Sequence, residues 1–285
     1  MKCTSQGGWG PRARFEPLRL LGEGGFGEVW EAVDRESGAR VALKRLKRLG
    51  PDGLRRLKAE FRALADVVHP RLVALHELWV YDGEACFSME LVVGVDVLSW
   101  VRGGEMARFD PSETRGDLGE ARAKPMHAEL SSVGAAQLGG ELGAPHGAVK
   151  APSLGPRLER LGSVSTQLVE GMAALHARGI VHRDLKPSNV LVDARGGVRI
   201  LDYGLAAACG TSARGFEGTP AYAAPEQALG EPAREPSDVY ALGVILFEAL
   251  ADRRPFEGDP QRLLAQKAQR SAPTLGSLVD GAPEE

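Results

Sequence analysis

The stretch LGEGGFGEV, residues 21–29, places glycines at positions 22, 24 and 27 in the spacing GxGxxG. Dinucleotide-binding folds use the same spacing, but in them a helix follows the glycines. Here the glycines lead into the β-rich run EVWEAV (28–33), which a turn-rich segment joins to a second such run, RVALKRL (40–46). The pattern therefore predicts a loop between two antiparallel strands, and it argues against a dinucleotide-dependent oxidoreductase.

Two uses of this loop are compatible with its residues. Its backbone N–H groups can cover the phosphates of a nucleotide, or the glycines can form an ordinary hairpin turn without a ligand. The strand context favours the nucleotide over the incidental turn, which makes Gly22, Gly24 and Gly27 candidate nucleotide-binding residues.

The first hundred residues are strand-rich and contain one helix. We expect strands at 14–21, 28–33, 40–46, 72–81 and 84–92. Between the third and fourth, apolar residues recur at three- and four-residue steps, which predicts a helix with one buried stripe. The stripe consists of Leu54, Leu57, Phe61, Leu64 and Val68, and His69-Pro70 should end the helix.

From about residue 157 the pattern turns helical. A stripe of Leu161, Val164, Leu168, Met172 and Leu175 predicts a helix over 157–179. Short strand-like pieces follow at 180–184, 189–193 and 198–204, and then a buried helix at 237–251. Its apolar run of 13 residues contains Glu248 and is short for a membrane span, which needs ~20 residues, so we expect no membrane segment.

Residues 103–156 differ in kind from both parts. Gly and Pro occupy 15 of these 54 positions, and Phe109 is the single aromatic residue. Such a composition cannot bury enough apolar surface to offset the entropy of ordering the chain. We expect a disordered insertion here.

The overall charge and the cysteines indicate which partners and which compartment to expect. A net charge of −3 and a pI of about 6.1 give no reason to expect nucleic acid. The three cysteines, Cys3, Cys86 and Cys209, are far apart in sequence, which suits a reducing compartment better than a disulfide framework. The N-terminus has no apolar stretch typical of a signal peptide, so we expect a cytoplasmic protein.

Lys44 and Glu60 form a candidate ion pair. Strand alternation in VALK places Ala42 and Lys44 on one face, so Lys44 could reach a phosphate where Ala42 leaves space for a flat base. An isolated strand lysine would more often be solvated. Glu60, however, lies at the margin of the helical stripe, where a partly buried carboxylate needs a cation, and Lys44 is the natural partner.

The stretch HRDLKPSNV (182–190) crowds Asp184, Lys186 and Asn189 together ahead of an apolar run. With the glycine loop, VALK, a helical glutamate, DYG (202–204), GTPAYAAPE (218–226) and SDVYALG (237–243), it makes the chain resemble a bacterial, multidomain kind of Hanks-type Ser/Thr protein kinase. One such motif is weak, but seven in the family's order are specific.

The resemblance implies a bilobal α+β fold. Residues 1–13 would be a flexible tail, 14–92 an N-lobe with an antiparallel sheet, one main helix and the hinge, and 93–285 a mostly helical C-lobe carrying the insertion. It also implies an enzyme that transfers the γ-phosphate of Mg·ATP to Ser and Thr hydroxyls of protein substrates and of itself. Lys186 and Thr219 resemble Ser/Thr rather than Tyr kinases.

The resemblance assigns the polar site residues. Asp184 would accept the substrate proton, and Lys186 would sit beside the transferring phosphate, with Thr219 contacting both. Asn189 and Asp202 would hold Mg²⁺. Lys44, fixed by Glu60, would bind the inner phosphates. Arg183 suggests control by phosphorylation at Thr211 or Ser212.

The resemblance also assigns the base pocket and a buried stack. Val29, Ala42 and Leu191 would sandwich the adenine, with Leu21 at the edge of the site. Met89 would be the gatekeeper, Glu90 to Val92 the hinge, and Asp96 the ribose contact. Leu64, His182 and Tyr203 would stack in a structural spine anchored by Asp238.

Two departures from the family are visible. Tyr203 replaces the usual Phe, and its added hydroxyl needs a partner. We also expect the last C-lobe helices and any downstream domains to be missing, which would leave Glu226 without its family arginine. The alternative function is therefore an ATP-binding pseudokinase or scaffold weakened by truncation.

Overall fold

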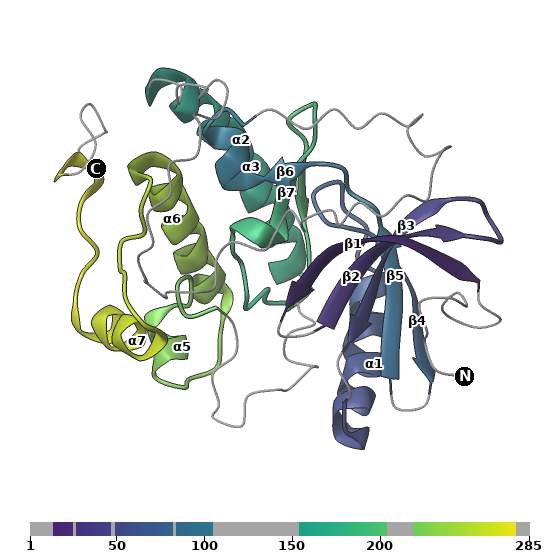
Figure 1. Ribbon diagram of the computed structural model, residues 1–285. Coiled ribbons are helices and arrows are strands. Elements are labelled where there is room, and N and C mark those ends of the chain that lie inside the picture. Colours follow the sequence, from purple (N-terminus) through teal and green to yellow (C-terminus); the bar gives the residue numbers. More distant parts are fainter. Residues whose placement is uncertain are drawn as a thin grey trace, which may run out of the picture.

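The computed structural model describes residues 14–24, 27–46, 49–81, 84–104, 154–203 and 219–277. A strand-rich lobe lies beside a helix-rich lobe (Figure 1). The predicted α+β, bilobal architecture is confirmed. No helix in these ranges is both long enough and apolar enough to cross a membrane.

The N-terminal lobe is one antiparallel sheet in the order β1-β2-β3-β5-β4. Its strands are β1 (Phe15–Gly24), β2 (Gly27–Asp34), β3 (Arg40–Leu46), β4 (Leu75–Tyr81) and β5 (Glu84–Glu90). The two faces of β3 go to different clusters, as alternation requires. Ala42 and Leu46 join the main core, whereas Val41 and Leu43 pack with Phe15 in a smaller cluster.

The helix of this lobe is α1 (Pro51–Ala65), and Leu57, Phe61 and Leu64 of its predicted stripe are buried. Val68 was wrongly placed in the stripe, because it is 87% exposed. The helix ends at Ala65, ahead of His69-Pro70, so the helical period no longer applies at Val68 and Val67 is the buried residue instead.

The C-terminal lobe is mainly helical. It contains α2 (Val97–Val101), α3 (Leu154–His176), α5 (Pro225–Ala228), α6 (Glu235–Ala251) and α7 (Pro260–Gln269), with 3-10 turns η2 (Pro187–Asn189) and η3 (Leu275–Ser277). Its two longest helices are α3 and α6. A small antiparallel sheet joins β6 (Val95–Asp96), β7 (Val190–Val192) and β8 (Val198–Ile200).

Several elements differ from the sequence prediction; for example, the strand expected from residue 72 begins at Leu75, and the strand expected to reach residue 204 ends at Ile200. Residues 180–184 form no strand in the described structure, because the backbone N–H groups of His182 and Arg183 donate to the Asp238 carboxylate rather than to a neighbouring strand. Helix α3 begins at Leu154, inside the predicted insertion 103–156. The interior of that insertion, 105–153, lies outside the described residues.

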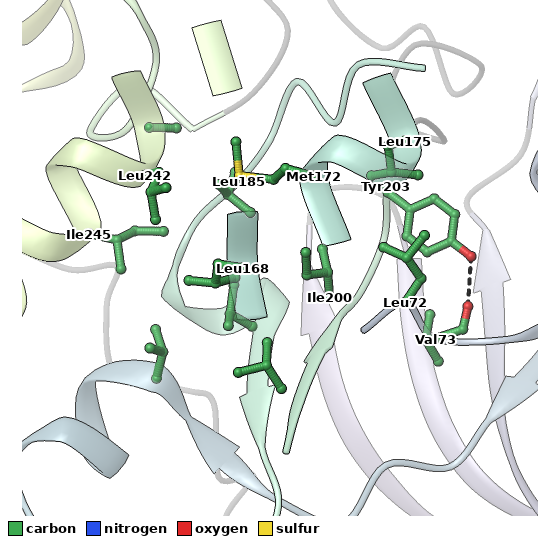
Figure 2. Packing of buried hydrophobic residues seen from close by; sticks show 14 of the residues in the cluster. Leu72, Val73, Leu168, Met172, Leu175, Leu185, Ile200, Tyr203, Leu242 and Ile245 are labelled. Carbon is green, nitrogen blue, oxygen red and sulfur yellow. Dashed lines mark hydrogen bonds between the residues drawn. The ribbon is translucent and has the colours of Figure 1, made fainter. Parts of the chain in front are cut away.

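Backbone hydrogen bonds connect the segment before β4 with β8 of the C-terminal lobe. Leu72 pairs with Ile200 of β8 in a parallel bridge, and the N–H of Val73 donates to the Ile200 carbonyl at 3.0 Å. In Figure 2, Leu72 and Val73 lie beside Ile200 and Tyr203, and Leu168 and Leu185 continue the apolar packing toward Leu242 and Ile245 of α6. The core therefore runs from α6 to the base of the N-terminal sheet.

Replacing Gly27 with alanine should destabilise the protein. Gly27 has φ +143°, and an added Cβ would lie 1.9 Å from the Arg45 carbonyl oxygen on the adjacent strand. A left-handed backbone alone costs about 1–3 kcal/mol in a non-glycine residue, and here a backbone clash is added. The melting temperature should fall by about 2–4 °C per kcal/mol.

Gly38→Ala is the matched control for this prediction. Gly38 has φ +72°, but nothing lies within 4 Å of its added Cβ, so that variant isolates the backbone strain from the clash. Equal melting temperatures for the two variants would contradict the role assigned to strand contact at Gly27.

Candidate active site

Three polar side chains of the C-terminal lobe contact one another: Asp184, Lys186 and Thr219. The Lys186 Nζ lies 2.7 Å from Asp184 Oδ2 and donates to Thr219 Oγ1 at 2.9 Å. The Thr219 hydroxyl donates to Asp184 Oδ1 at 2.8 Å. Both oxygens of Asp184 are thus oriented, and the predicted contact of Thr219 with Asp184 and Lys186 is confirmed.

Asp238, in the first turn of α6, binds the backbone of the residues that precede Asp184. Its carboxylate accepts from the backbone N–H groups of His182 at 2.8 Å and Arg183 at 3.0 Å, and it also lies 2.8 Å from His176 Nε2. Arg183 has φ +71°, an unfavourable conformation that the surroundings must enforce. A buried carboxylate with these partners fixes the turn that presents Asp184, and its bond to the His182 N–H agrees with the anchoring role that the resemblance implied for Asp238.

Asn189 ends η2 and points back to the same turn. Its side chain is buried, and Nδ2 donates to the Asp184 carbonyl at 2.8 Å. With the amide nitrogen committed to this bond, the amide oxygen is the atom that can bind a cation.

Lys44 of β3 and Asp202 form an ion pair between the lobes. Lys44 Nζ lies 2.5 Å from Asp202 Oδ2, and only 8% of the lysine side chain is exposed. Burial raises the pKa of Asp202, but the charge and hydrogen bond of Lys44 outweigh it, so this pKa lies below its ordinary value. The carboxyl is therefore ionised at neutral pH.

The second oxygen of Asp202 fits a metal ligand. Within the described residues, the buried Oδ1 has no hydrogen-bond partner, and Asp202 has φ +56°. An ionised oxygen held without a donor is costly unless a cation binds it. Hard cations such as Mg²⁺ prefer carboxylate and amide oxygens, so Asp202 and Asn189 fit that metal.

Glu60 is half-buried on α1, the helix expected to carry it. Lys44 forms its ion pair with Asp202, and the predicted Lys44–Glu60 pair stays a prediction.

Tyr203, which replaces the family's usual phenylalanine, is fully buried and its hydroxyl donates to the Val73 carbonyl at 2.6 Å (Figure 2). Burial, with the negative charge of Glu90 acting in the same direction, raises the pKa of Tyr203, so the hydroxyl keeps its proton. Tyr203 and Leu64 belong to one core cluster, and His182 is also buried.

Tyr203→Phe should lower the stability by about 0.5–1.5 kcal/mol, because it removes one buried hydrogen bond and keeps the ring. Tyr203→Leu, which also removes the ring, should cause a larger loss. Denaturant unfolding of both variants measures the difference. A Phe variant as stable as the wild type would show that the bond to Val73 contributes nothing.

The apolar candidates for a base pocket converge on one core cluster. Ala42 and Met89 are buried members, and Leu21, Val29 and Leu191 are partly exposed residues packed against it. In the described chain, no backbone hydrogen bond outside the regular elements involves Leu91 or Val92. The predicted hinge therefore has polar backbone groups next to an apolar surface.

Asp96 and Glu90 have structural partners of their own. Asp96 caps α2, accepting from the N–H groups of Leu98 and Ser99 and from the Ser99 hydroxyl. The Glu90 side chain lies 3.4 Å from Arg199 Nε. The predicted ribose contact of Asp96 and the base contact at Glu90 stay predictions.

The glycine loop joins two antiparallel strands, as predicted, with Gly22 opposite Val29 and Gly24 opposite Gly27. Residues 25 and 26 at its tip lie outside the described residues, as do the candidate phosphorylation sites Thr211 and Ser212.

The expected lack of the family arginine at Glu226 stays a prediction, but Glu226 does have a hydrogen-bond partner, because its Oε1 accepts from the Ser237 hydroxyl at 2.5 Å. This serine lies in the first turn of α6. Sequence reasoning also missed Gln227, whose Nε2 donates to the Arg183 carbonyl at 3.2 Å, and Lys267. Lys267 could have been found, because it shares the buried face of α7 with Leu263, where a lysine needs acceptors.

Comparisons with known proteins all identify protein kinases. The protein kinase domain family matches residues 15–126 and 154–277. The serine/threonine-protein kinase PknA of Mycobacterium tuberculosis is 34% identical over 267 residues, which cover 91% of this chain and 52% of that protein.

Two further relatives agree with this match. The serine/threonine-protein kinase pkn2 of Myxococcus xanthus is 33% identical over 93% of this chain and 29% of its own length. The DNA damage-responsive serine/threonine-protein kinase RqkA of Deinococcus radiodurans is 33% identical over 95% of this chain and 35% of its own length. The chain thus spans about half or less of the curated relatives it matches.

Proposed function

The chain belongs to the protein kinase domain family, as a Ser/Thr kinase domain of the bacterial Hanks type, and from this premise we propose that it is catalytically active. The proposed reaction transfers the γ-phosphate of Mg·ATP to Ser and Thr hydroxyls of proteins, including hydroxyls of this chain. The observation that carries the proposal is the triangle of Asp184, Lys186 and Thr219 next to the Lys44–Asp202 pair.

Asp184 is the proposed acceptor of the substrate proton. Phosphoryl transfer needs little covalent help, so alignment and charge neutralisation carry most of the catalysis. Lys186 and Thr219 fix the Asp184 carboxylate from two sides, which presents an oriented oxygen to an incoming hydroxyl. The Lys186 ammonium also places a positive charge where the transferring phosphate would lie.

Lys44, Asp202 and Asn189 are the proposed phosphate and metal residues. Bound Mg²⁺ would supply neutralisation of the phosphate charge. Lys44 is held in place by Asp202 and would bind phosphate oxygens, with Glu60 as its proposed second partner. The unpaired Oδ1 of Asp202 and the amide oxygen of Asn189 are the proposed metal ligands.

The apolar residues are the proposed adenine site. Leu21, Val29, Ala42, Met89 and Leu191 would contact the faces and edge of the base. Glu90 and Val92 would offer backbone groups to it, the glycines of the loop would cover the phosphates, and Asp96 would contact the ribose. We also propose a reducing, cytoplasmic setting, because the three cysteines are odd in number and far apart in sequence.

The test combines transfer and binding. The chain is incubated with Mg²⁺, γ-labelled ATP and a generic basic protein, and the melting temperature is measured with and without Mg·ATP. We expect label in protein and a raised melting temperature. A raised melting temperature without label would support a nucleotide-binding pseudokinase instead, and the absence of both would reject the proposal.

A further inference from the structure

Lys267 is a buried charged group to which the proposed reaction assigns no role. It lies on the inner face of α7, where only 4% of it is exposed. Figure 1 shows α7 beside α5, the short helix that follows the segment carrying Thr219.

The ammonium of Lys267 binds three backbone carbonyls. Its Nζ donates to the oxygens of Pro220 at 2.7 Å, Ala221 at 2.8 Å and Ala223 at 2.8 Å. A lysine ammonium has three donors, so the three acceptors satisfy it completely. In the described chain, no backbone N–H outside the regular elements donates to these three oxygens, and Lys267 is the donor that they share.

The surroundings of Lys267 oppose its charge, which makes these carbonyls important. Burial, with the positive charge of Arg254 acting in the same direction, lowers the pKa of Lys267 to about 7. The Tyr240 ring lies 5.5 Å from Nζ and offers a cation–π contact. The carbonyls and the ring are therefore the groups that hold a cation inside this part of the fold.

The carbonyls belong to the turn that presents Thr219. The N–H groups of Tyr222 and Ala223 donate to the Thr219 carbonyl at 2.9 and 3.1 Å, which closes a turn over residues 219–223. The Thr219 hydroxyl at the start of this turn donates to Asp184 and accepts from Lys186. Three carbonyls of the same turn, at residues 220, 221 and 223, accept from Lys267.

We propose that Lys267 is a positioning residue that links α7 to the catalytic group through the turn 219–223. This inference rests on the proposed kinase activity. Without Lys267, the three carbonyls lose their donor and the turn can shift, so Thr219 no longer fixes Asp184 and Lys186. A displacement of about 1 Å near reacting groups can reduce a rate by as much as about 10²-fold.

The test uses Lys267→Met, which keeps the length of the side chain and removes its charge. Protein phosphorylation is measured below pH 7, where the wild-type ammonium is populated, and below the melting temperature of every variant. We expect kcat to fall by about 10–100-fold while the KM for Mg·ATP stays within about 2-fold, because Lys267 lies away from the nucleotide residues.

Two variants of the same helix control for other effects. Arg270→Met removes an exposed positive charge from the end of α7, and Leu263→Ala loosens the packing of the same buried face without removing the ammonium. Both should keep kcat within about 2-fold of the wild type. A loss of kcat in Leu263→Ala as large as in Lys267→Met, or an unchanged kcat in Lys267→Met, would overturn the proposal.

Amide hydrogen exchange separates this inference from the proposed activity. Lys267→Met should accelerate exchange at Tyr222 and Ala223, whose N–H groups close the turn, and Arg270→Met should not. If the wild type transfers no phosphate, the proposed function fails, but the exchange measurement still applies. Unchanged exchange in Lys267→Met would overturn the link between α7 and the turn.

Discussion

Asp184→Asn should reduce phosphoryl transfer by about 10²–10⁴-fold, the range typical of losing a positioned general base. Asparagine has nearly the shape of aspartate, but it cannot accept a proton from a substrate hydroxyl. It also gives up the ion pair with Lys186, which lies 2.7 Å from the carboxylate. Initial rates with γ-labelled Mg·ATP and a generic basic protein measure the effect.

Nucleotide binding should survive this substitution, because Lys44 and Asp202 do not depend on Asp184 for their mutual contact. The rise in melting temperature with Mg·ATP should therefore remain in Asp184→Asn. Asp66→Asn, which changes an exposed carboxylate just after α1, is the control and should keep full activity. A fully active Asp184→Asn would show that the chemistry takes place elsewhere.

Asp202→Ala should abolish the part of the thermal stabilisation by ATP that depends on Mg²⁺. The substitution removes an ionised carboxylate whose Oδ1 has no partner in the described chain, and it also removes the counter-ion of Lys44. Metal-assisted charge stabilisation is worth several kcal/mol, so transfer should also fall by at least about 10²-fold.

The comparison for Asp202→Ala is a titration of melting temperature against ATP, with Mg²⁺ and with a chelator. In the wild type the two curves should differ, and in Asp202→Ala they should coincide. Asp193→Ala, which removes a carboxylate at the nearby turn after β7, should keep the two curves apart. An undiminished magnesium effect in Asp202→Ala would sink the metal assignment.

The elements with a clear period were predictable from the sequence. The alternation in β3 correctly separated Ala42 and Lys44 from Val41 and Leu43, because one face of the strand meets the main core and the other a smaller cluster. Ends of elements were less predictable. Val68 continued the helical spacing, but the chain leaves the helix at Ala65, and periodicity alone does not contain the position of that exit.

The polar contacts of the site were predictable only where residues are close in sequence or occur in a known motif. Thr219 was expected beside Asp184 and Lys186, and it lies there. The position of Lys267 beside Leu263 on α7 could have indicated a buried lysine, but its acceptors could not be predicted, because they are backbone carbonyls of residues 220, 221 and 223 and every residue has a carbonyl. The partner of Glu226, Ser237, was missed because the family pattern directed attention to an arginine.

The most direct test of the central claim compares ATP labelled at the γ-phosphate with ATP labelled at the α-phosphate. Each is incubated with the chain, Mg²⁺ and a basic protein, and labelled protein is hydrolysed to identify the phosphorylated amino acid. The triangle of Asp184, Lys186 and Thr219 predicts label from the γ-position alone, on serine or threonine, and its loss in Asp184→Asn. Label of equal intensity in wild type and Asp184→Asn, or none from γ-labelled ATP with Mg²⁺ present, would contradict it.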